Sequence, residues 1–421
     1  MTVIRLGLCL AMAFAVAAHG AVEPWSEFIL LAVLAGLLLL WGLMAVTRST
    51  LRLHWNPLLA PLLALGAIGL AQLLLGFSAY PYATKAELLR LTIYLFAFFL
   101  AVQVFRTAQE CKLLVWFLLV LGFATALFGI IQHLTFNGKL YWVRELRLEA
   151  YPFGPYVNRN HFAGLMELMI PLGMACIFLR GVRRDQLPLV SLFTLVPVGG
   201  LFLSASRGGI LAFALQFVFL TVLVWVALRG KKKLALALVF VAVGGAFLLW
   251  LDPAPALRRL TEIGTEEISR SRRLMIARDT WEIFLDHPVA GTGLGTFEQV
   301  YPQYESYYDG KVIEHAHNDY LELLAESGGL GGLCALVFLW LLFRRAWARL
   351  QEDHFAFALA TRIGCLVACA GVLLHDLVDF NLRLPSHALL FSVLAAVATA
   401  PLTTSLPPPP PAPVNPWGAA A

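Results

Sequence analysis

Long apolar runs alternate with short polar segments over almost the whole chain. The runs are about 20 residues long, which is the length that an α-helix needs to cross a bilayer core of roughly 30 Å. Lipid offers no hydrogen-bond partners to backbone groups, so such runs are expected to be helical. The pattern predicts about twelve spans, near residues 4–20, 27–46, 57–75, 87–105, 113–132, 161–179, 187–203, 209–228, 234–251, 328–343, 356–374 and 386–401.

The first of these segments, 4–20, has a second interpretation. Arg5 precedes its apolar centre, and small residues around His19 follow it, which is also the pattern of a cleaved signal peptide. Either interpretation leaves the order of the later spans unchanged.

Composition supports a membrane protein, because 60% of the 421 residues are hydrophobic and 14% are charged, against about 25% charged in soluble domains. The predicted fold class is all-α: a polytopic membrane protein with about twelve transmembrane helices and one large periplasmic loop that contains amphipathic helices. Residues 1–251 and 328–401 would hold the transmembrane helices, 252–327 the loop, and 402–421 a disordered Pro-rich cytoplasmic tail.

The distribution of basic residues predicts the orientation, since cytoplasmic loops are enriched in Lys and Arg. Alternate short loops carry clusters of them: Arg48 and Arg52; Arg106 and Lys112; Arg180, Arg183 and Arg184; Arg229 and Lys231 to Lys233; and Arg344, Arg345 and Arg349. The loops 133–160, 204–208, 252–327 and 375–385 would then be external. Arginines in those external loops run against the bias, so each invites a functional explanation.

The large loop is predicted to contain an amphipathic helix from about Ser269 to Asp286 that lies on the membrane surface. One stripe holds Leu274, Ala277, Trp281 and Phe284, and the opposite side holds Arg272, Asp279, Glu282 and Asp286. Pro288 and the glycine run 291–295 stop this helix. No strand precedes the glycines, so they indicate a tight turn rather than a nucleotide site.

The sequence His-Ala-His-Asn-Asp (315–319) is the most informative polar cluster. Asp319 and Glu322 fit a capping box, which predicts that a helix begins here and leads into the next span. Capping does not explain His317, which is a candidate general base because histidine has a neutral form near neutral pH. A His-x-His zinc site has little support, because no third soft ligand is nearby.

Several external arginines are candidates for binding a phosphate, because a guanidinium makes two parallel hydrogen bonds to phosphate oxygens. Arg207 occupies a very short turn beside two glycines, Arg159 precedes a span, and Arg270, Arg272 and Arg273 crowd the start of the amphipathic helix. A single arginine at such a boundary is more often an interfacial residue.

Two further polar features have structural interpretations. The segment from His375 to Arg383, between the last two spans, is interpreted as an interfacial ion-paired turn. Glu167 lies inside a predicted span and is a functional candidate by its position, with a buried hydrogen bond as the alternative.

Four motifs together resemble the O-antigen ligase and O-antigen polymerase superfamily, over roughly residues 150–390. They are Val-Asn-Arg-Asn-His-Phe-Ala-Gly (157–164), Ser-Arg-Gly-Gly (206–209), His-Pro-Val-Ala-Gly-Thr-Gly-Leu-Gly (287–295) and His-Ala-His-Asn-Asp-Tyr-Leu (315–321). The resemblance implies a multi-pass glycosyltransferase of a bacterial inner membrane, with its active site facing the periplasm. Its donor would be a glycan on undecaprenyl pyrophosphate, and it would use neither a nucleotide sugar nor a nucleic acid.

The resemblance also implies roles for individual residues. Arg207 and Arg273 would hold the pyrophosphate, with Arg272 and Arg270 as alternatives to Arg273, and His317 would be the general base. Candidate substrate-binding residues are Arg159, His161, Arg270, Arg272, His315 and Asn318. The external segments contain no Asp-x-Asp metal pair, so we expect no cofactor and metal-independent transfer. Attack opposite the leaving group predicts inversion at the anomeric carbon.

The function expected from these residues is that of an O-antigen ligase, which joins the glycan to a sugar of lipid A–core. A polymerase that extends the carrier-linked glycan performs the same chemistry on another acceptor, and the motifs do not separate the two. A protein oligosaccharyltransferase remains open as well. A transporter of lipid-linked glycan is disfavoured, because the polar groups gather at one face rather than in mid-membrane.

Overall fold

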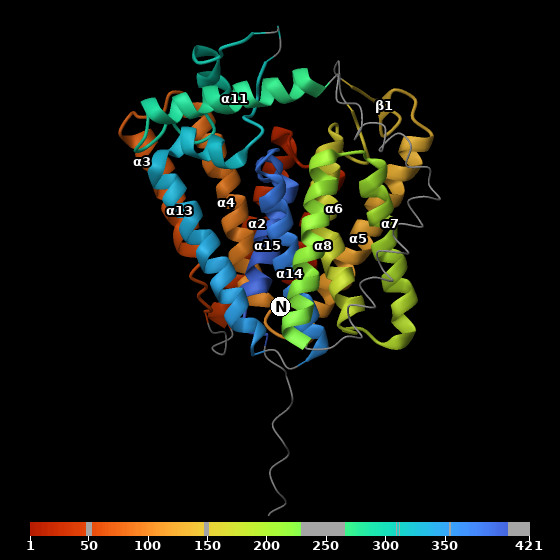
Figure 1. The fold of residues 1–421 in the computed structure, drawn as a ribbon. Helices are drawn as coiled ribbons and strands as arrows, with labels where there is room; N and C mark the ends of the chain where they lie inside the picture. Colours follow the sequence, from red (N-terminus) through yellow and green to blue (C-terminus); the bar gives the residue numbers. More distant parts are fainter. Residues whose placement is uncertain are drawn as a thin grey trace, which may run out of the picture.

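The computed structural model describes residues 1–47, 53–146, 151–228, 266–308, 310, 312–352 and 355–402. Within them the chain is a bundle of helices standing side by side, with α11 (Glu266–Asp286) lying across one end (Figure 1). Two short strands, β1 (Lys139–Leu140) and β2 (Arg144–Glu145), pair antiparallel in the segment after α5. The described part of the chain is therefore essentially helical, as predicted.

Each predicted span except 234–251 coincides with a helix. These helices are α1 (Thr2–Ala17), α2 (Pro24–Thr47), α3 (Leu59–Leu74), α4 (Pro81–Val104), α5 (Ala108–Leu134), α6 (Arg159–Phe178), α7 (Leu187–Leu203), α8 (Arg207–Leu228), α13 (Asp319–Leu350), α14 (Ala356–His375) and α15 (Pro385–Thr399). The span predicted at 234–251, the start of the predicted loop (252–265) and the predicted tail from residue 403 lie outside the described residues.

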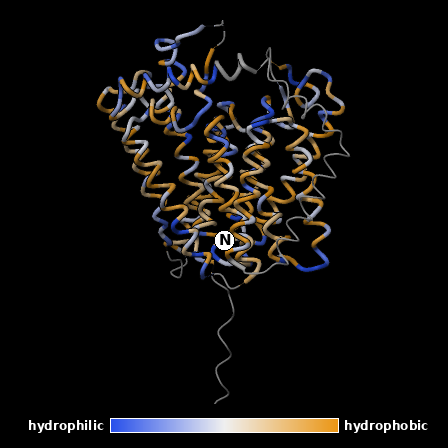
Figure 2. Tube along the Cα trace, viewed as in Figure 1, coloured by the Kyte–Doolittle hydropathy of each residue, from blue (hydrophilic) through white to orange (hydrophobic). Residues whose placement is uncertain are grey.

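The described helices have the apolar character of membrane spans. Eight of them are long and apolar enough to cross a membrane, and α1, α3 and α15 are shorter apolar helices. Figure 2 shows hydrophobic residues along the middle of the bundle and hydrophilic residues towards its two ends. This distribution supports a multi-pass membrane protein, while the count of twelve spans stays a prediction.

The centre of the bundle is formed by α6, α14 and α15, which are buried along most of their length. Small residues allow α6 and α14 to approach closely, as is typical of helices packed in membranes. A Cβ added to Gly364 of α14 would lie 2.7 Å from the Cα of Leu172 in α6. These central helices fix the polar connection between α14 and α15 relative to the start of α6.

The end of the bundle away from α11 is held by polar contacts between helix termini. The buried side chain of Arg362 donates hydrogen bonds to the carbonyls of Ala398 (2.7 Å) and Ala400 (2.9 Å), at the end of α15. Arg5 pairs with Glu110, which joins the starts of α1 and α5. The predicted cytoplasmic loop 106–112 belongs to this end, and which end faces the periplasm stays a prediction.

The helix α11 was predicted, but one residue of its expected polar side, Asp279, was placed wrongly. Leu274 and Trp281 of the expected apolar stripe are 66% and 42% exposed, whereas Ile276, Asp279 and Ile283 are buried. The buried side packs on a small cluster of its own with α12 (Phe297–Val300) and the 3₁₀ helix η2 (Tyr301–Gln303).

The burial of Asp279 was not expected, because the sequence pattern placed this residue on the polar side of the helix. Its Oδ2 accepts hydrogen bonds from the Tyr301 hydroxyl (3.1 Å) and from the backbone N–H and the hydroxyl of Ser306 (both 3.0 Å). A carboxylate satisfied by local donors can be buried, and the helical period alone does not reveal those donors. α11 thus carries one face that packs on the loop and a second, apolar face that is exposed.

The glycine run forms the predicted turn, and the turn packs on a break in α13. Gly291, Gly293 and Gly295 have φ of 68°, 120° and 75°, and Gly328 within α13 has φ 63°. A Cβ on Gly291 would lie 2.2 Å from the backbone carbon of Glu326. The turn and the break therefore fit together backbone against backbone.

We expect Gly291→Ala to destabilise the protein more than Gly76→Ala. Gly76 has a similar φ of 73°, but a Cβ there meets nothing within 4 Å. Gly76→Ala should cost about 1 kcal/mol for the left-handed backbone, and Gly291→Ala about 3 kcal/mol because the clash adds to it. Thermal unfolding in detergent measures both, and equal losses would contradict the packing described above.

Candidate functional site

The connection between α14 and α15, residues 376–384, gathers the polar groups at the end of the bundle that carries α11. It includes the 3₁₀ helix η3 (Asn381–Arg383). Asp376, Asp379 and Asn381 are 0%, 1% and 0% exposed. The polar side chains of the connection are thus more deeply buried than we expected of an interfacial turn, while Leu377 and Val378 are exposed.

Local hydrogen bonds give the connection its shape. The backbone N–H and the side-chain amide of Asn381 both donate to Asp376 Oδ1 at 3.0 Å. Gly164 of α6 makes room for this turn, because a Cβ there would lie 2.2 Å from Asn381 Oδ1. The glycine that ends the motif at 157–164 therefore has a packing role.

The start of α13 is held against the connection, and its cap differs from the prediction. Asn318 caps the helix by accepting hydrogen bonds from the first turn, and its side chain donates to the carbonyl of Leu377 (2.9 Å). The expected capping box of Asp319 with Glu322 is wrong. Asp319 accepts from the N–H of Leu382 (3.0 Å) and Glu322 from that of Ala316 (2.7 Å), so both carboxylates are engaged by other partners.

Asp379 lies between two of the candidate histidines. Its Oδ1 is 3.9 Å from Nδ1 of His317 and 4.0 Å from Nε2 of His161, and its Oδ2 accepts a hydrogen bond from Asn160 (2.7 Å). His317 has φ 51°, a left-handed conformation that is uncommon for a residue with a side chain. The sequence motifs at 157–164 and 315–321 thus meet at one carboxylate.

The surroundings of Asp379 favour its ionised form. Burial by itself raises the pKa of Asp379, but the neighbouring His317, His161 and His375 outweigh burial, so the pKa lies below its ordinary value. A carboxylate held in this state stabilises positive charge on an adjacent imidazole. His317 can therefore take up a proton with a counter-charge already in place.

His315 is engaged differently. Its Nδ1 lies 2.8 Å from Oε1 of the buried Glu322, and its ring stacks on Phe380 with the centroids 4.4 Å apart. Burial lowers the pKa of His315, but the charge and the hydrogen bond of Glu322 outweigh it, and the net shift is upward. A raised pKa leaves less of the neutral imidazole that a general base requires, and Nδ1 of His315 is already engaged by Glu322, so His317 is the better candidate.

The candidate arginines Arg207 and Arg273 come from two helices to the same part of the connection. Arg207 begins α8, and a Cβ on the next residue, Gly208, would lie 2.7 Å from Nε2 of His375. Arg273 of α11 donates to the carbonyl of Val378 (2.9 Å). The start of α8, which carries Arg207, and the side chain of Arg273 therefore approach residues 375–378, next to Asp379.

The other candidate arginines are placed less closely. Arg272 is the neighbour of Arg273 on α11, and its positive charge acts against the rise that burial causes in the pKa of Tyr301. The side chain of Arg270 lies outside the described residues. Arg159 begins α6 and lays its guanidinium over the ring of Tyr151, 5.1 Å from the centroid. The described contacts tie Arg159 to the segment before α6 rather than to Asp379.

Glu167, the candidate inside a span, pairs with His375. Its Oε1 lies 2.9 Å from Nδ1 of His375, and both side chains are 0% exposed. Gln216 of α8 donates to the backbone carbonyl of Glu167 (3.0 Å). The pair joins α6 to α14 directly beneath the start of α8.

Arg383 is the residue that sequence reasoning most undervalued. Its guanidinium is 2.9 Å from Glu326, 3.2 Å from Glu322, 3.7 Å from Asp319 and 3.8 Å from Glu87. Burial lowers the pKa of Arg383, but these carboxylates outweigh burial and raise it well above its ordinary value, so the charge is permanent. The sequence did contain a signal for Arg383, because this arginine follows two aspartates in a short connection between two apolar segments.

A polar cavity of about 590 Å³ opens beside this cluster. Its lining includes His161, His315, Phe380, Glu87, Glu298, Glu314, Glu322, Glu326 and Arg383. The cavity therefore joins the histidines to the carboxylates of the Arg383 cluster.

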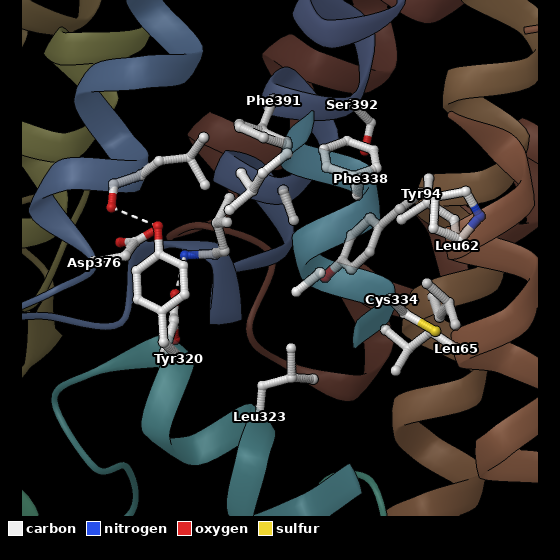
Figure 3. A pocket seen from close by; sticks show the side chains of 18 of the residues that line it. Leu62, Leu65, Tyr94, Tyr320, Leu323, Cys334, Phe338, Asp376, Phe391 and Ser392 are labelled. Atoms are coloured by element: carbon white, nitrogen blue, oxygen red, sulfur yellow. Dashed lines mark hydrogen bonds between the residues drawn. The ribbon is translucent and has the colours of Figure 1, made fainter. Parts of the chain in front are cut away.

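An apolar pocket of about 210 Å³ is lined by residues of α3, α4, α13, α14 and α15 (Figure 3). Leu62, Tyr94, Phe338 and Phe391 are among the residues that line it, and Asp319 and Asp376 lie at its polar border. The hydroxyl of Tyr320 donates to the carbonyl of Leu373 (2.7 Å). The pocket suits an apolar chain rather than a sugar.

The described residues contain no group of three or more His, Cys, Asp or Glu side chains arranged to hold a metal ion. The two histidines of the His-x-His sequence point to different carboxylates, Glu322 and Asp379. They do not form the pair of ligands that a zinc site requires.

Comparison with known families gives one match. Residues 192–336 match the family model described as O-Antigen ligase. The match spans α7, α8, α11 and the first half of α13, and so includes Arg207, Arg273 and His317. It is narrower than the resemblance across the four motifs, because Arg159, His161 and residues 376–384 lie outside it. No curated protein matches the chain.

The His315–Glu322 contact should make stability depend on pH. The pKa of His315 is raised, so its contribution is complete below the ordinary value of about 6.5 and is lost as the pH rises through the higher value of the folded protein. We expect His315→Gln to lower the unfolding temperature most near pH 6 and progressively less towards pH 9. A difference from wild type that does not change with pH would contradict this assignment.

Proposed function

Given the O-antigen ligase domain at residues 192–336, we propose that the protein transfers a glycan from undecaprenyl pyrophosphate to a sugar hydroxyl of lipid A–core. The family match supports a membrane glycosyltransferase of the ligase and polymerase type. The observation that carries the proposal is one cluster: the start of α8 at Arg207 and the side chain of Arg273 lie near residues 375–378, and His317 lies 3.9 Å from Asp379. The site would face the periplasm, at a bacterial inner membrane.

In the proposed reaction the arginines act on the leaving group. The acceptor oxygen forms a bond to the anomeric carbon while the bond from that carbon to the pyrophosphate oxygen breaks, with its electron pair passing to the pyrophosphate. Arg207 and Arg273 would bind the phosphate oxygens through paired N–H groups and stabilise the charge as it develops. This requires no metal ion.

The proton of the acceptor hydroxyl would go to His317. Asp379 is a positioning residue in this scheme, because it stabilises the imidazolium that forms without touching the substrate. Attack from the side opposite the pyrophosphate inverts the anomeric carbon. The left-handed backbone of His317 is consistent with a side chain held in one orientation for this role.

The apolar pocket between α3, α4 and α13 would accommodate part of a lipid. Its border at Asp319 and Asp376 lies next to the connection 376–384, so an apolar chain there would end close to the polar cluster. This arrangement suits a substrate with an apolar tail and a charged head.

Single substitutions should separate these roles. We expect His317→Ala to lower the rate of transfer by about 10²- to 10⁴-fold through loss of the base, and Arg207→Ala by about 10²- to 10³-fold through loss of charge stabilisation. The matched controls are His287→Ala and Arg278→Ala, which change exposed residues of the same types in the same outer region. Transfer by purified, folded variants from a lipid-pyrophosphate glycan measures the effect, and wild-type rates in His317→Ala would exclude its role as base.

The phenotype of a strain that lacks the protein should distinguish a ligase, which uses lipid A–core as its acceptor, from an enzyme that uses another acceptor. We expect lipopolysaccharide that ends at the core, together with long glycan retained on the undecaprenyl carrier. Gel electrophoresis of lipopolysaccharide and extraction of the carrier-linked pool measure both. Core bearing a single repeat unit would instead identify a polymerase, and unchanged lipopolysaccharide would contradict both.

A further inference from the structure

The polar cavity has a charge balance unlike that of a phosphate site. Its lining contains six glutamates and two arginines. Both arginines are already paired: Arg90 lies 2.7 Å from Glu27 and 3.0 Å from Glu87, and Arg383 lies 2.9 Å from Glu326. A phosphate could engage either guanidinium only by separating it from a largely buried carboxylate, which is costly.

The same lining suits sugar hydroxyls. An ionised carboxylate only accepts hydrogen bonds, and it does so strongly from O–H groups. Glu298 and Glu314 are exposed at the cavity, whereas Glu322 and Glu326 are held in the wall by Arg383. The stacked rings of His315 and Phe380 add a flat surface of the kind on which a sugar ring packs.

The position of the cavity supports a role in the reaction independently of its charge. His161 lines the cavity, and its side chain is only 12% exposed. Its Nε2 has no hydrogen-bond partner among the described residues. That nitrogen lies 4.0 Å from the same Asp379 oxygen that is 3.9 Å from His317. A ring bound in the cavity would therefore contact a histidine that also neighbours Asp379.

We propose that this cavity is the acceptor subsite, and that it selects a terminal acceptor sugar that is neutral or carries an amino group while rejecting one that carries phosphate or carboxylate. The selection follows from repulsion by the exposed Glu298 and Glu314 together with the loss of their hydrogen bonds. This inference rests on the proposed glycosyl transfer. The acceptor would then lie against a wall rich in carboxylates, whereas the donor phosphates would lie at Arg207 and Arg273.

The test uses the full-length protein in detergent or nanodiscs with two acceptors, a neutral oligosaccharide and the same oligosaccharide with a phosphate monoester on its terminal sugar. Glu298→Gln combined with Glu314→Gln should raise the KM for the neutral acceptor about tenfold and leave the KM for the donor unchanged. Glu298→Lys combined with Glu314→Lys should reduce the preference for the neutral over the phosphorylated acceptor. Glu282→Gln, an exposed glutamate of α11 outside the cavity lining, is the control.

An unchanged acceptor KM in the double Gln variant, or a rise confined to the donor KM, would overturn the proposal. Direct binding of the two oligosaccharides, measured by calorimetry without donor, separates its failure from that of the proposed function. Binding of the neutral oligosaccharide that is weakened in the double Gln variant, without transfer by the wild type, would support the cavity and reject the transferase. Transfer by the wild type with equal use of both acceptors would support the transferase and reject the acidic subsite.

Discussion

The end of the molecule that carries α11 depends on the positive charge of Arg383. Glu87 comes from α4, and Glu322 and Glu326 from α13, and each lies within 4 Å of its guanidinium. Without that cation the cluster would hold several carboxylates at short range, and burying uncompensated charges is far more costly than any surface ion pair is stabilising. Arg383 thereby ties α4 and α13 to the connection that also carries Asp379. One short segment therefore holds both the cation that pairs with the glutamates of the cavity and the carboxylate that lies beside His161 and His317.

Much of the fold could be predicted from the sequence, because the requirement to satisfy backbone groups in lipid leaves helices as the open-chain solution. Segments such as 113–132 and 356–374 therefore coincide with α5 and α14. The faces of α11 could not be predicted in the same way. Its period is visible in the sequence, but whether Asp279 faces water depends on Tyr301 and Ser306, which only the folded loop brings near.

The candidate site likewise contains residues that could be predicted from the sequence and residues that could not. His317, Arg207 and Arg273 stand out because their residue types conflict with their position beside apolar spans. Asp379 and Arg383 were interpreted as parts of an interfacial ion-paired turn, since charged residues near a span end are usually interfacial. Their importance comes from partners distant in sequence, such as Asn160 for Asp379 and Glu87 for Arg383. Spacing along one chain segment carries no information about such pairs.

The order of these residues along the chain has a consequence for biogenesis. Glu322 and Glu326 precede Arg383, and the helix α14 lies between the second of these glutamates and the arginine. During synthesis from the N-terminus, both carboxylates therefore emerge before the arginine that pairs with them. They remain without it until α14 has been made and the connection has reached the same side of the bundle, so this end of the molecule is completed last, and a nascent chain arrested before that point lacks Arg383 as their counter-charge.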